Sequence, residues 1–477
     1  MNNIESREWA DETFGRSNLG DPRRTARLID YARRQADDPA ASTFGSCGGD
    51  VAASEGAYRF LRNDYVDPKA IDIGVNLSTA KLCKGLKLVL AIQDSTSVEV
   101  AHVPLRKELE REGCPTGFMV HSTIMVNGES GFPIGLMGQE RWTRPKEIIS
   151  ESESVVAEKK RVYTEKESYR WETASREMVD IMGDVGNVIT VCDREADIYE
   201  FLQYHQDNEL RYIVRAAQDR RLAKGSRLWQ AMEEMPILGY REIQIEQRGP
   251  WKPQFESLRP GRKARKATLA IHAGTTKLLW PKNDKPKEAR PVVVNVVYVR
   301  EVNPPEGHVP LVWKLLTTEP VDSLEAASFV VSCYEKRWII EEFHKSWKVG
   351  CRLEERPLQS LKAVERQMAI SAPIGIRLLQ FQYMAEAEPD APCDKLLTKE
   401  EWQCLCAITN PGKALPKKPP TNSYVYYAIA KMGGWMDTKR NGRVGWQSIW
   451  KGWHRFQDKL HGWRIARSAY GGAQSDL

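Results

Sequence analysis

The sequence predicts a mixed α/β protein whose central sheet region is flanked along the chain by two helical regions. Short apolar runs in the middle of the chain end in an acidic residue, which is typical of buried strands. Residues 268–272 and 292–299 are apolar in the manner of antiparallel hairpins, and helical patterns fill residues 1–70 and the chain from 361 onward. A length of 477 residues with 41% hydrophobic and 28% charged residues indicates a folded chain of several domains.

Residues 1–70 are expected to form short helices. Asp21 followed by Pro22 is a typical helix start. On the helix that follows, Arg23, Arg27 and Arg34 are separated by 4 and 7 residues and so share one face. A second helix is expected through residues 55–62. The segment is slightly acidic overall, so only an organised basic face could bind nucleic acid.

The middle of the chain is expected to contain a sheet. We predict two strands that end in an aspartate, 86–94 and 187–193, and further strands at 118–126, 131–137 and 211–215. Helices are expected at 145–180 and 199–204, and helix resumes at 322. Between about 220 and 310 the pattern predicts an insertion of antiparallel strands with a basic loop at 259–266.

The two strands that end in Asp94 and Asp193 suggest a site. Carboxylates brought together at neighbouring strand ends repel each other unless a cation holds them, and hard divalent ions such as Mg²⁺ prefer oxygen ligands. The alternative is that each aspartate only caps the turn or helix after it.

Residues 334–348 are expected to form one amphipathic helix. One stripe is polar and the opposite stripe is apolar and buried; the polar members are Tyr334, Arg337, Glu341, Lys345 and Lys348, and the apolar members are Ile339, Ile340, Phe343 and Trp347. The polar stripe suits a site in which one carboxylate completes a metal site while cations hold phosphates. A solvated, salt-bridged face is the alternative.

Charge is concentrated at the end of the chain. Residues 411–477 contain twelve basic and three acidic residues, a net charge of +9, with five tryptophans among them. This pattern fits either a polyanion-binding surface or a helical domain with a solvated basic face. A Pro-rich linker is expected at 415–420. We expect a cytoplasmic protein with reduced thiols, because we see no signal peptide, no apolar run long enough to span a membrane and no CxxC pair among nine cysteines.

Several separated motifs resemble one family. Tyr334, Arg337, Glu341 and Lys348 match the Tyr-x2-Arg-x3-Glu-x6-Lys signature of insertion-sequence-4 transposases. Residues 92–97 and 192–197 resemble the first-Asp and second-Asp motifs of that family, and residues 19–28, 55–60 and 433–437 extend the similarity over essentially the whole chain. In place of the basic and aromatic stretch with which relatives read their DNA ends, this chain has Asp37-Asp38-Pro39, so its end sequence is expected to differ.

The resemblance implies an RNase H-like catalytic core with an inserted antiparallel β subdomain. It implies an all-α DNA-binding domain at 1–70, the catalytic domain at 71–365 and an all-α dimerisation domain at 366–477. Asp94, Asp193 and Glu341 would be catalytic and would hold two Mg²⁺ ions, with Mn²⁺ as a substitute. The partners implied are double-stranded transposon ends, target DNA and a second copy of the chain, in a bacterial protein associated with the nucleoid when bound to DNA.

The resemblance also implies an activity and a set of DNA contacts. The activity is nicking of the transposon 3′ end, formation and opening of a hairpin, and strand transfer into target DNA. A non-enzymatic repressor that occupies transposon ends is the alternative, and a nuclease without joining activity is a weaker one. Trp313 lies in a segment, 310–316, that resembles the one whose Trp stacks on a flipped base, although its local sequence equally suits a core residue. The residues expected to contact DNA are Tyr334, Arg337, Lys345, Lys348, Trp313, Arg215, Arg23, Arg24, Arg27 and Arg62.

Overall fold

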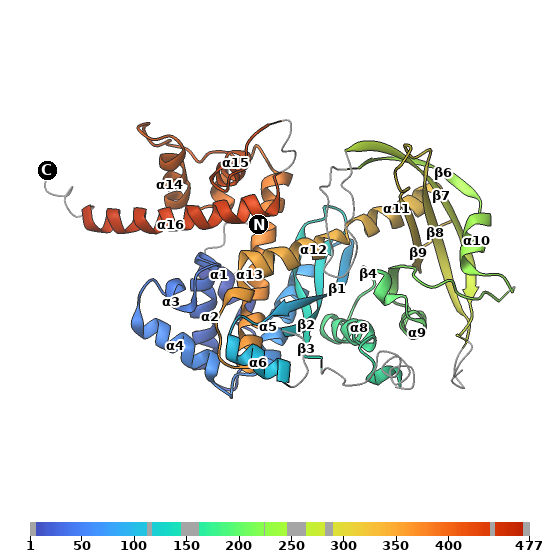
Figure 1. Cartoon of the computed structure of the whole chain (residues 1–477), viewed down its shortest axis with the longest axis horizontal. Coiled ribbons are helices and arrows are strands. Elements are labelled where there is room, and N and C mark those ends of the chain that lie inside the picture. The colour runs from blue at the N-terminus through green and yellow to red at the C-terminus, as the bar shows by residue number, and fades with distance from the viewer. Residues whose placement is uncertain are drawn as a thin grey trace. The chain divides into compact units, whose positions relative to one another are not determined.

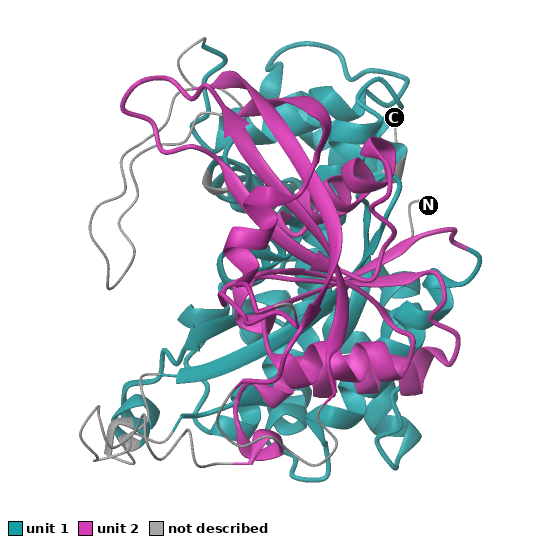
Figure 2. Ribbon diagram, turned by 90° about the vertical axis from the view of Figure 1, so that its right-hand side faces the viewer, with its two compact units in different colours: residues 1–85, 95–150, 339–477 teal, residues 86–94, 151–338 magenta. Residues whose placement is uncertain are grey.

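A computed structural model describes residues 6–111, 117–144, 162–223, 225–245, 264–281, 290–438 and 444–470, and its elements are labelled in Figure 1. The chain divides into two compact units, coloured teal and magenta in Figure 2. Unit 1 comprises residues 1–85, 95–150 and 339–477, and unit 2 comprises residues 86–94 and 151–338. Our division into three domains stays a prediction.

Unit 2 is built on a sheet with the strand order β1-β4-β5-β9-β8-β7-β6. β1, β4 and β5 run parallel, and the strands from β5 to β6 pair antiparallel. The strands are β1 (Val89–Glu99), whose first six residues belong to this unit, β4 (Val188–Cys192), β5 (Arg211–Arg215), β6 (Ile237–Ile245), β7 (Arg265–Leu278), β8 (Val292–Val302) and β9 (Val312–Thr317). The antiparallel pairing predicted between 220 and 310 is therefore present. These strands belong to the same sheet as β1, β4 and β5 and extend it beyond β5. Most of the predicted basic loop lies outside the described residues.

Helices of unit 2 pack against this sheet around a continuous apolar core. Phe201 and Leu202 of α9 pack with Tyr212 of β5 and Val296 of β8, and each of these side chains is buried. The helices are α8 (Tyr169–Met182), α9 (Tyr199–Asp207), α10 (Leu228–Glu234) and α11 (Leu324–Glu335), with short turns η1 (Tyr163–Glu165) and η2 (Arg194–Ala196). Residues 145–161 of the helix predicted at 145–180 lie outside the described residues.

Unit 1 begins with five helices, and the starts of the second to the fifth are set by polar caps. The side chains of Asp21, Ser42, Asp50 and Asp67 each accept a hydrogen bond from the first turn of the helix that follows them, as N-cap residues do. The helices are α1 (Ser6–Phe14), α2 (Pro22–Asp37), α3 (Thr43–Ser46), α4 (Val51–Arg62) and α5 (Pro68–Cys83).

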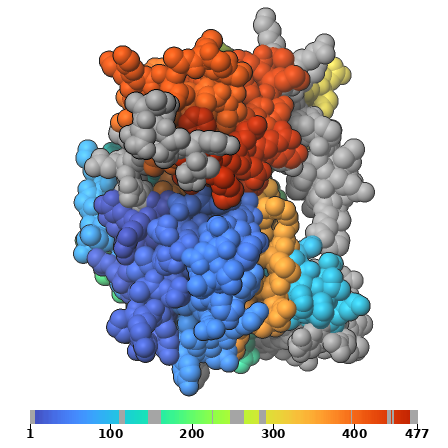
Figure 3. All heavy atoms as spheres, turned by 90° about the vertical axis from the view of Figure 1, so that its left-hand side faces the viewer, coloured from blue at the N-terminus to red at the C-terminus, as the bar shows by residue number. Residues whose placement is uncertain are grey.

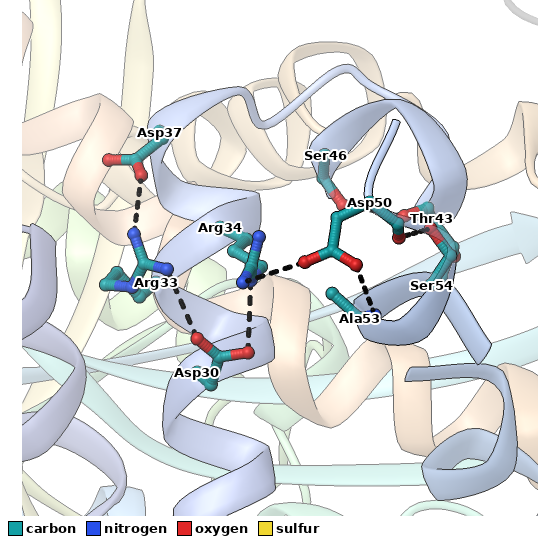
Figure 4. A network of polar contacts seen from close by, with 9 residues as sticks. All are labelled: Asp30, Arg33, Arg34, Asp37, Thr43, Ser46, Asp50, Ala53 and Ser54. Carbon is teal, nitrogen blue, oxygen red and sulfur yellow. Dashed lines mark hydrogen bonds and ion pairs between the residues drawn. The ribbon is translucent and has the colours of Figure 1, made fainter. Parts of the chain in front are cut away.

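An ionic network joins α2 to the start of α4 (Figure 4). The Asp30 carboxylate forms salt bridges with Arg33 at 3.2 Å and with Arg34 at 3.0 Å. Arg34 also lies 3.9 Å from the carboxylate of Asp50, the N-cap of α4. Arg33 has a second acidic partner in Asp37, at 3.4 Å. Arg34, which the sequence placed on one face with Arg23 and Arg27, is therefore engaged in holding the two helices together.

The rest of unit 1 surrounds one long helix, α13 (Leu361–Ala387), which packs on α2, α4, α5 and β3. The β2–β3 hairpin is hydrogen-bonded to β1, in the order β3-β2-β1. The other elements are β2 (Gly117–Asn127), β3 (Pro133–Trp142), α6 (Val103–Arg111), α12 (Trp338–Lys345), η3 (Ser346–Gly350), η4 (Leu353–Glu355), η5 (Cys393–Lys395), α14 (Lys399–Thr409), α15 (Asn422–Met432) and α16 (Trp446–Tyr470).

Tryptophans of the basic C-terminal region belong largely to its core. Trp435, Trp450 and Trp453 are all less than 10% exposed, so these three do not form a stacking surface for a polyanion. Around them α15 and α16 touch through their backbones, because a Cβ on Gly452 would lie 1.8 Å from the Ile429 carbonyl oxygen. Packing thus explains three of the five tryptophans of the predicted polyanion surface, and the rest of that surface stays a prediction. No helix in the described ranges is long and apolar enough to cross a membrane.

Buried polar contacts attach the N-terminal helices to α13. The Tyr31 hydroxyl donates to Gln367 Oε1 at 2.8 Å and lies 3.0 Å from the Thr43 hydroxyl. Arg366, 2% exposed, donates to the carbonyl oxygens of Val66 at 2.7 Å and Leu61 at 2.9 Å. The blue N-terminal helices form a continuous surface in Figure 3, with the orange segment that contains α13 beside them. The first 85 residues are therefore an integral part of unit 1.

Candidate active site

Three predicted site residues stand in one row across three parallel strands of unit 2. Asp193 and Arg215 lie at the ends of β4 and β5, whereas the prediction of a strand that ends at Asp94 is wrong, because β1 continues to Glu99. Ile92 of β1 is paired with Val191 of β4, and Cys192 of β4 is paired with Val214 of β5. Continued by one or two residues, these registers bring Asp94 beside Asp193, and Asp193 beside Arg215. Residues in the same register of neighbouring parallel strands point to the same face of a sheet. Burial raises the pKa of the Cys192 thiol well above its usual value, and the charges of Asp193 and Asp94 raise it further, which agrees with two carboxylates nearby.

Asp94 forms an ion pair with Arg337, which lies near the last residue of unit 2 in the sequence. Arg337 Nη1 donates to Asp94 Oδ2 at 3.3 Å, and the two side chains are 14% and 15% exposed. At this degree of burial the attraction is less screened than between surface charges. The sequence predicted both residues as members of the site but gave no sign of this direct contact.

The Asp193 side chain caps the turn that follows it, which is the alternative role that the sequence suggested for this residue. Its Oδ1 accepts the backbone N–H of Glu195 at 2.9 Å and so begins η2. This hydrogen bond fixes the orientation of the carboxylate at the end of β4. Capping and a position beside Asp94 are therefore compatible.

An aromatic pair lies near Arg215, one of the three residues of this row. The rings of Trp313 on β9 and Tyr334 on α11 meet edge to face, with centroids 5.9 Å apart and planes at 64°. Trp313 is half-buried and lies outside the core cluster of unit 2, whereas Tyr334 is 5% exposed. Burial raises the pKa of Tyr334, and the neighbouring Arg215 and Arg337 oppose that rise. Arg215 itself donates to the Val312 carbonyl oxygen at 3.2 Å, next to Trp313.

The single helix predicted over residues 334–348 is wrong. α11 ends at Glu335, and Lys336 and Arg337 form a tight turn in which Arg337 N–H donates to the Tyr334 carbonyl at 2.9 Å. α12 follows, and from Ser346 the chain continues as a π-helical turn. The break puts Tyr334 in a buried position instead of on the polar stripe. The predicted apolar stripe of Ile339, Ile340, Phe343 and Trp347 is confirmed as buried.

Glu341, Lys345 and Lys348 belong to unit 1. Glu341 is half-buried on α12, and Lys345 is exposed at the end of that helix. Lys348 lies in the π-helical turn, where its Nζ donates to Thr96 Oγ1 at 3.1 Å and to the Ser97 carbonyl at 3.2 Å. π-Helical turns often occur at functional positions. Thr96 and Ser97 are the last two residues of the first aspartate motif, and their contact with Lys348 was not predicted.

The four predicted arginines of the N-terminal helices differ in how they are held. Arg23 is 91% exposed at its side chain and pairs with Asp21 at 2.9 Å. Arg24 donates to the Leu19 carbonyl at 2.9 Å and lies 5.0 Å from the Tyr65 ring. Arg27 is exposed and passes over Gly56 of α4, while Arg62 lies 5.6 Å from the Tyr58 ring. These contacts leave cationic groups on α2 and α4 at the protein surface.

The carboxylates in this row fit a hard divalent ion. Within the described ranges, no three acidic, histidine or cysteine side chains gather closely enough to form a ready-made metal site. Asp94 within β1 and Asp193 at the end of β4 occupy the same register of adjacent parallel strands, and carboxylate oxygens are the ligands that such ions prefer. Asp94 and Asp193 therefore fit the chemistry of a metal site, whereas the part of Glu341 stays a prediction.

A further group beside the row was missed from the sequence. Asp197 and Arg220 form a buried ion pair just beyond the ends of β4 and β5. The only signal that could have found it is a second acid within Asp193-Arg194-Glu195-Ala196-Asp197, four residues after the predicted ligand.

Two family models match the chain. Residues 6–66 match a transposase DNA-binding domain, and residues 172–373 match a transposase DDE domain. The class of protein is therefore a DDE-type DNA transposase that carries its own DNA-binding domain. A DDE domain implies an RNase H-like core and a divalent-metal-dependent enzyme that cleaves and transfers DNA, and the mixed α/β sheet of unit 2 is of the corresponding class.

One solved structure is similar over most of the chain. It is the piggyBac transposase synaptic complex with hairpin DNA, which is 9% identical, with 97% of this chain and 80% of that chain covered. The TM-score is 0.35, a superposition too loose to establish a common fold in detail.

Proposed function

We propose that this protein is a cut-and-paste DNA transposase of the insertion-sequence-4 family, closest to the transposon-five transposase. It would excise a transposon by nicking its 3′ ends, forming a hairpin and opening it, and would then join the freed ends to target DNA. Its partners would be two double-stranded transposon ends, target DNA and a second copy of the chain in the synaptic complex.

The observation that carries the proposal is the row of Asp94, Asp193 and Arg215 on adjacent parallel strands, within a chain that matches a DDE domain. Asp94, Asp193 and Glu341 would hold Mg²⁺, which when bound activates the attacking oxygen and stabilises the leaving oxygen. The signature spacing of Glu341 from Arg337 supports its inclusion. Carboxylates of this kind supply full negative charge to the ion, which a neutral side chain cannot do.

The cationic and aromatic neighbours would handle the DNA. Arg337 contacts Asp94 and so stands where a phosphate beside that carboxylate can be bound by a charge-assisted hydrogen bond. Arg215 and Tyr334 would hold the strand that is cut, and Lys345 and Lys348 would neutralise its backbone. The half-buried Trp313 beside Tyr334 would stack on a base turned out of the hairpin.

Replacement of the carboxylates tests the proposal. Asp193→Asn, Asp94→Asn and Glu341→Gln should each keep DNA binding and lose Mg²⁺-dependent cleavage, because an amide is a poor ligand for a hard cation. Asp180→Asn, an exposed carboxylate on α8, is the matched control and should cleave normally. The measurements are binding by gel shift and nicking of end DNA found by selection from random duplexes. Binding without cleavage by the wild-type chain would indicate a repressor, and cleavage without joining of a pre-cut end would indicate a nuclease.

Glu342, the neighbour of Glu341 and not a member of the predicted polar stripe, is unsuitable as the control. It is 7% exposed, and its Oε2 accepts the Tyr383 hydroxyl at 2.7 Å, which ties α12 to α13. Changing Glu342 would disturb the helix that carries Glu341.

A further inference from the structure

Asp197 is a buried carboxylate beside the proposed site, and both of its oxygens accept hydrogen bonds. Its side chain is 0% exposed and that of Arg220 is 7% exposed. Oδ1 accepts both Arg220 Nε at 2.9 Å and Arg220 Nη2 at 2.6 Å, and Oδ2 accepts the backbone N–H groups of Ala217 and Gln218 at 2.7 Å each. Arg220 Nη2 also donates to the Asp197 carbonyl oxygen at 2.6 Å. We call these two side chains with their five hydrogen bonds the Asp197–Arg220 clamp.

The clamp joins the two segments that follow two members of the row. Asp197 ends the turn that Asp193 begins: Ala196 N–H donates to the Asp193 carbonyl at 3.3 Å, and Asp197 N–H donates to the Arg194 carbonyl at 3.2 Å. Ala217 and Gln218 come two and three residues after Arg215. Because both connections are short, the clamp restrains the distance between the Asp193 carboxylate and the Arg215 guanidinium.

The same clamp reaches the strand that carries Trp313. Ala216, between Arg215 and the clamped amides, donates its N–H to the Lys314 carbonyl of β9 at 2.7 Å. A shift of the loop after β5 would therefore also move the neighbour of Trp313. The clamp sits where Asp193, Arg215 and Trp313 can all be displaced by one change.

A buried ion pair is a poor device for stability alone. The free energy needed to remove two charges from water offsets much of their attraction, and apolar replacements are often equally stable. The directional hydrogen bonds of a bidentate arginine, in contrast, fix geometry. Sites that hold metal ions depend on such outer partners, whose loss typically lowers metal affinity or activity about 10- to 100-fold.

We propose that Asp197 and Arg220 are positioning residues of the transposase site, which hold Asp193 in register with its neighbours on β1 and β5. They touch neither DNA nor the reacting phosphate. The inference rests on the proposed function, because it takes Asp193 to be a metal ligand.

The test is Mn²⁺ binding by the full-length protein, followed by electron paramagnetic resonance, together with the melting temperature. Asp197→Asn leaves an amide NH₂ facing donors on one side, so Asp193 loses its fixed position. We expect its dissociation constant for Mn²⁺ to rise about tenfold or more. Arg220→Lys keeps the charge but loses the planar, forked set of donors that arginine offers, and should show a smaller rise in the same sense.

Glu319→Gln is the matched control. Glu319 is 4% exposed and pairs with Arg211 at 2.6 Å, at the opposite end of the same strand β5. The Glu319→Gln variant should have a lower melting temperature, as Asp197→Asn should, but its dissociation constant for Mn²⁺ should equal that of the wild type. An equal loss of Mn²⁺ binding in Glu319→Gln, or an unchanged dissociation constant in Asp197→Asn, would overturn the positioning role.

Asp193→Asn separates this inference from the proposed function. If Asp193→Asn weakens Mn²⁺ binding and Asp197→Asn does not, the clamp is only structural and the proposed site stands. If Asp193→Asn binds Mn²⁺ as the wild type does, the proposed metal site itself is wrong, and the positioning role fails with it.

Discussion

Trp313 is the residue at which the two readings of the sequence differ most. Its local sequence suited a core position equally well, but in the structure the ring is half-buried, lies outside the core cluster and meets Tyr334 edge to face. An edge-to-face contact covers at most one face of either ring, so Tyr334 leaves at least one face of Trp313 for stacking on a base. The structure thus provides a position in which the proposed stacking is geometrically reasonable.

We predict that Trp313→Ala separates the steps of excision. Stacking of one base contributes about 1–3 kcal/mol, so hairpin formation and opening should slow by about one to two orders of magnitude. The first nick needs no flipped base and should stay near the wild-type rate. Single-turnover assays of nick and hairpin, with the melting temperature measured in parallel, check this. Uniform slowing of every step with a large fall in melting temperature would assign Trp313 to the core.

The charged residues of the site show what the sequence could predict at this scale. Asp94 and Asp193 were predicted because apolar runs end at them, and the register of β1 and β4 brings these positions together. The Arg337–Asp94 contact joins residues 243 positions apart and leaves no local pattern. The same holds for the Asp197–Arg220 clamp, whose partners lie in the segments that follow two different strands, β4 and β5.

At the scale of elements, strands were easier to predict than the helices around the signature. Strand β5 was predicted at its observed bounds, and β4 within one residue at each end, because buried parallel strands are continuous apolar runs between polar residues. The helix over 334–348 failed because an apolar period persists through a tight turn and a π-helical turn that change the phase of the side chains. Periodicity records which residues are buried and does not record such local changes of register.

Helix α2 gives a prediction about DNA binding. Arg27 is exposed over Gly56, whereas Arg33 of the same helix is held by Asp30 and Asp37. Arg27→Ala should weaken binding to end DNA and random DNA alike and flatten the dependence of affinity on salt, because phosphate contacts release counterions and carry no sequence information. Arg33→Ala is the control and should leave the salt slope unchanged. Gel shifts over a range of salt concentrations measure both; a loss confined to one base position would make Arg27 a base reader.

Helix α9 gives a prediction about pH. Burial lowers the pKa of His205 to about 4 from a usual 6.5, and its Nδ1 lies 2.9 Å from the Phe201 carbonyl. The unfolded chain takes up a proton near pH 6.5 and the folded chain does not, so stability falls as the pH drops from about 6.5 to about 4, by about 3 kcal/mol. His205→Phe should reduce the pH dependence of the urea midpoint in that window. An unchanged slope would place the acid sensitivity elsewhere.

At the scale of the whole molecule, the N-terminal helices are built into unit 1 together with α13 and the C-terminal helices. The transposase DNA-binding match ends at residue 66, and Arg366 of α13 donates to the carbonyl of that same residue. The sequence predicted the N-terminal helical region but not this attachment, because the contacts that make it are separated by 300 residues or more. Composition and periodicity contain no information about such pairs.

This attachment predicts that the N-terminal helices and α13 unfold together. Gln367 is buried at 0% exposure and accepts the Tyr31 hydroxyl, so Gln367→Leu leaves that hydroxyl with one partner fewer in a site without water access. A buried polar group that loses its partner lowers the free energy of unfolding by about 1–3 kcal/mol. Gln380→Leu on the same helix, at a half-buried position that contacts β3, is the control for changing an α13 glutamine. If unit 1 is cooperative, hydrogen exchange in Gln367→Leu should accelerate equally in α2, α4 and α13. Acceleration confined to α2 would show that the DNA-binding helices open independently, with α13 remaining folded beneath them.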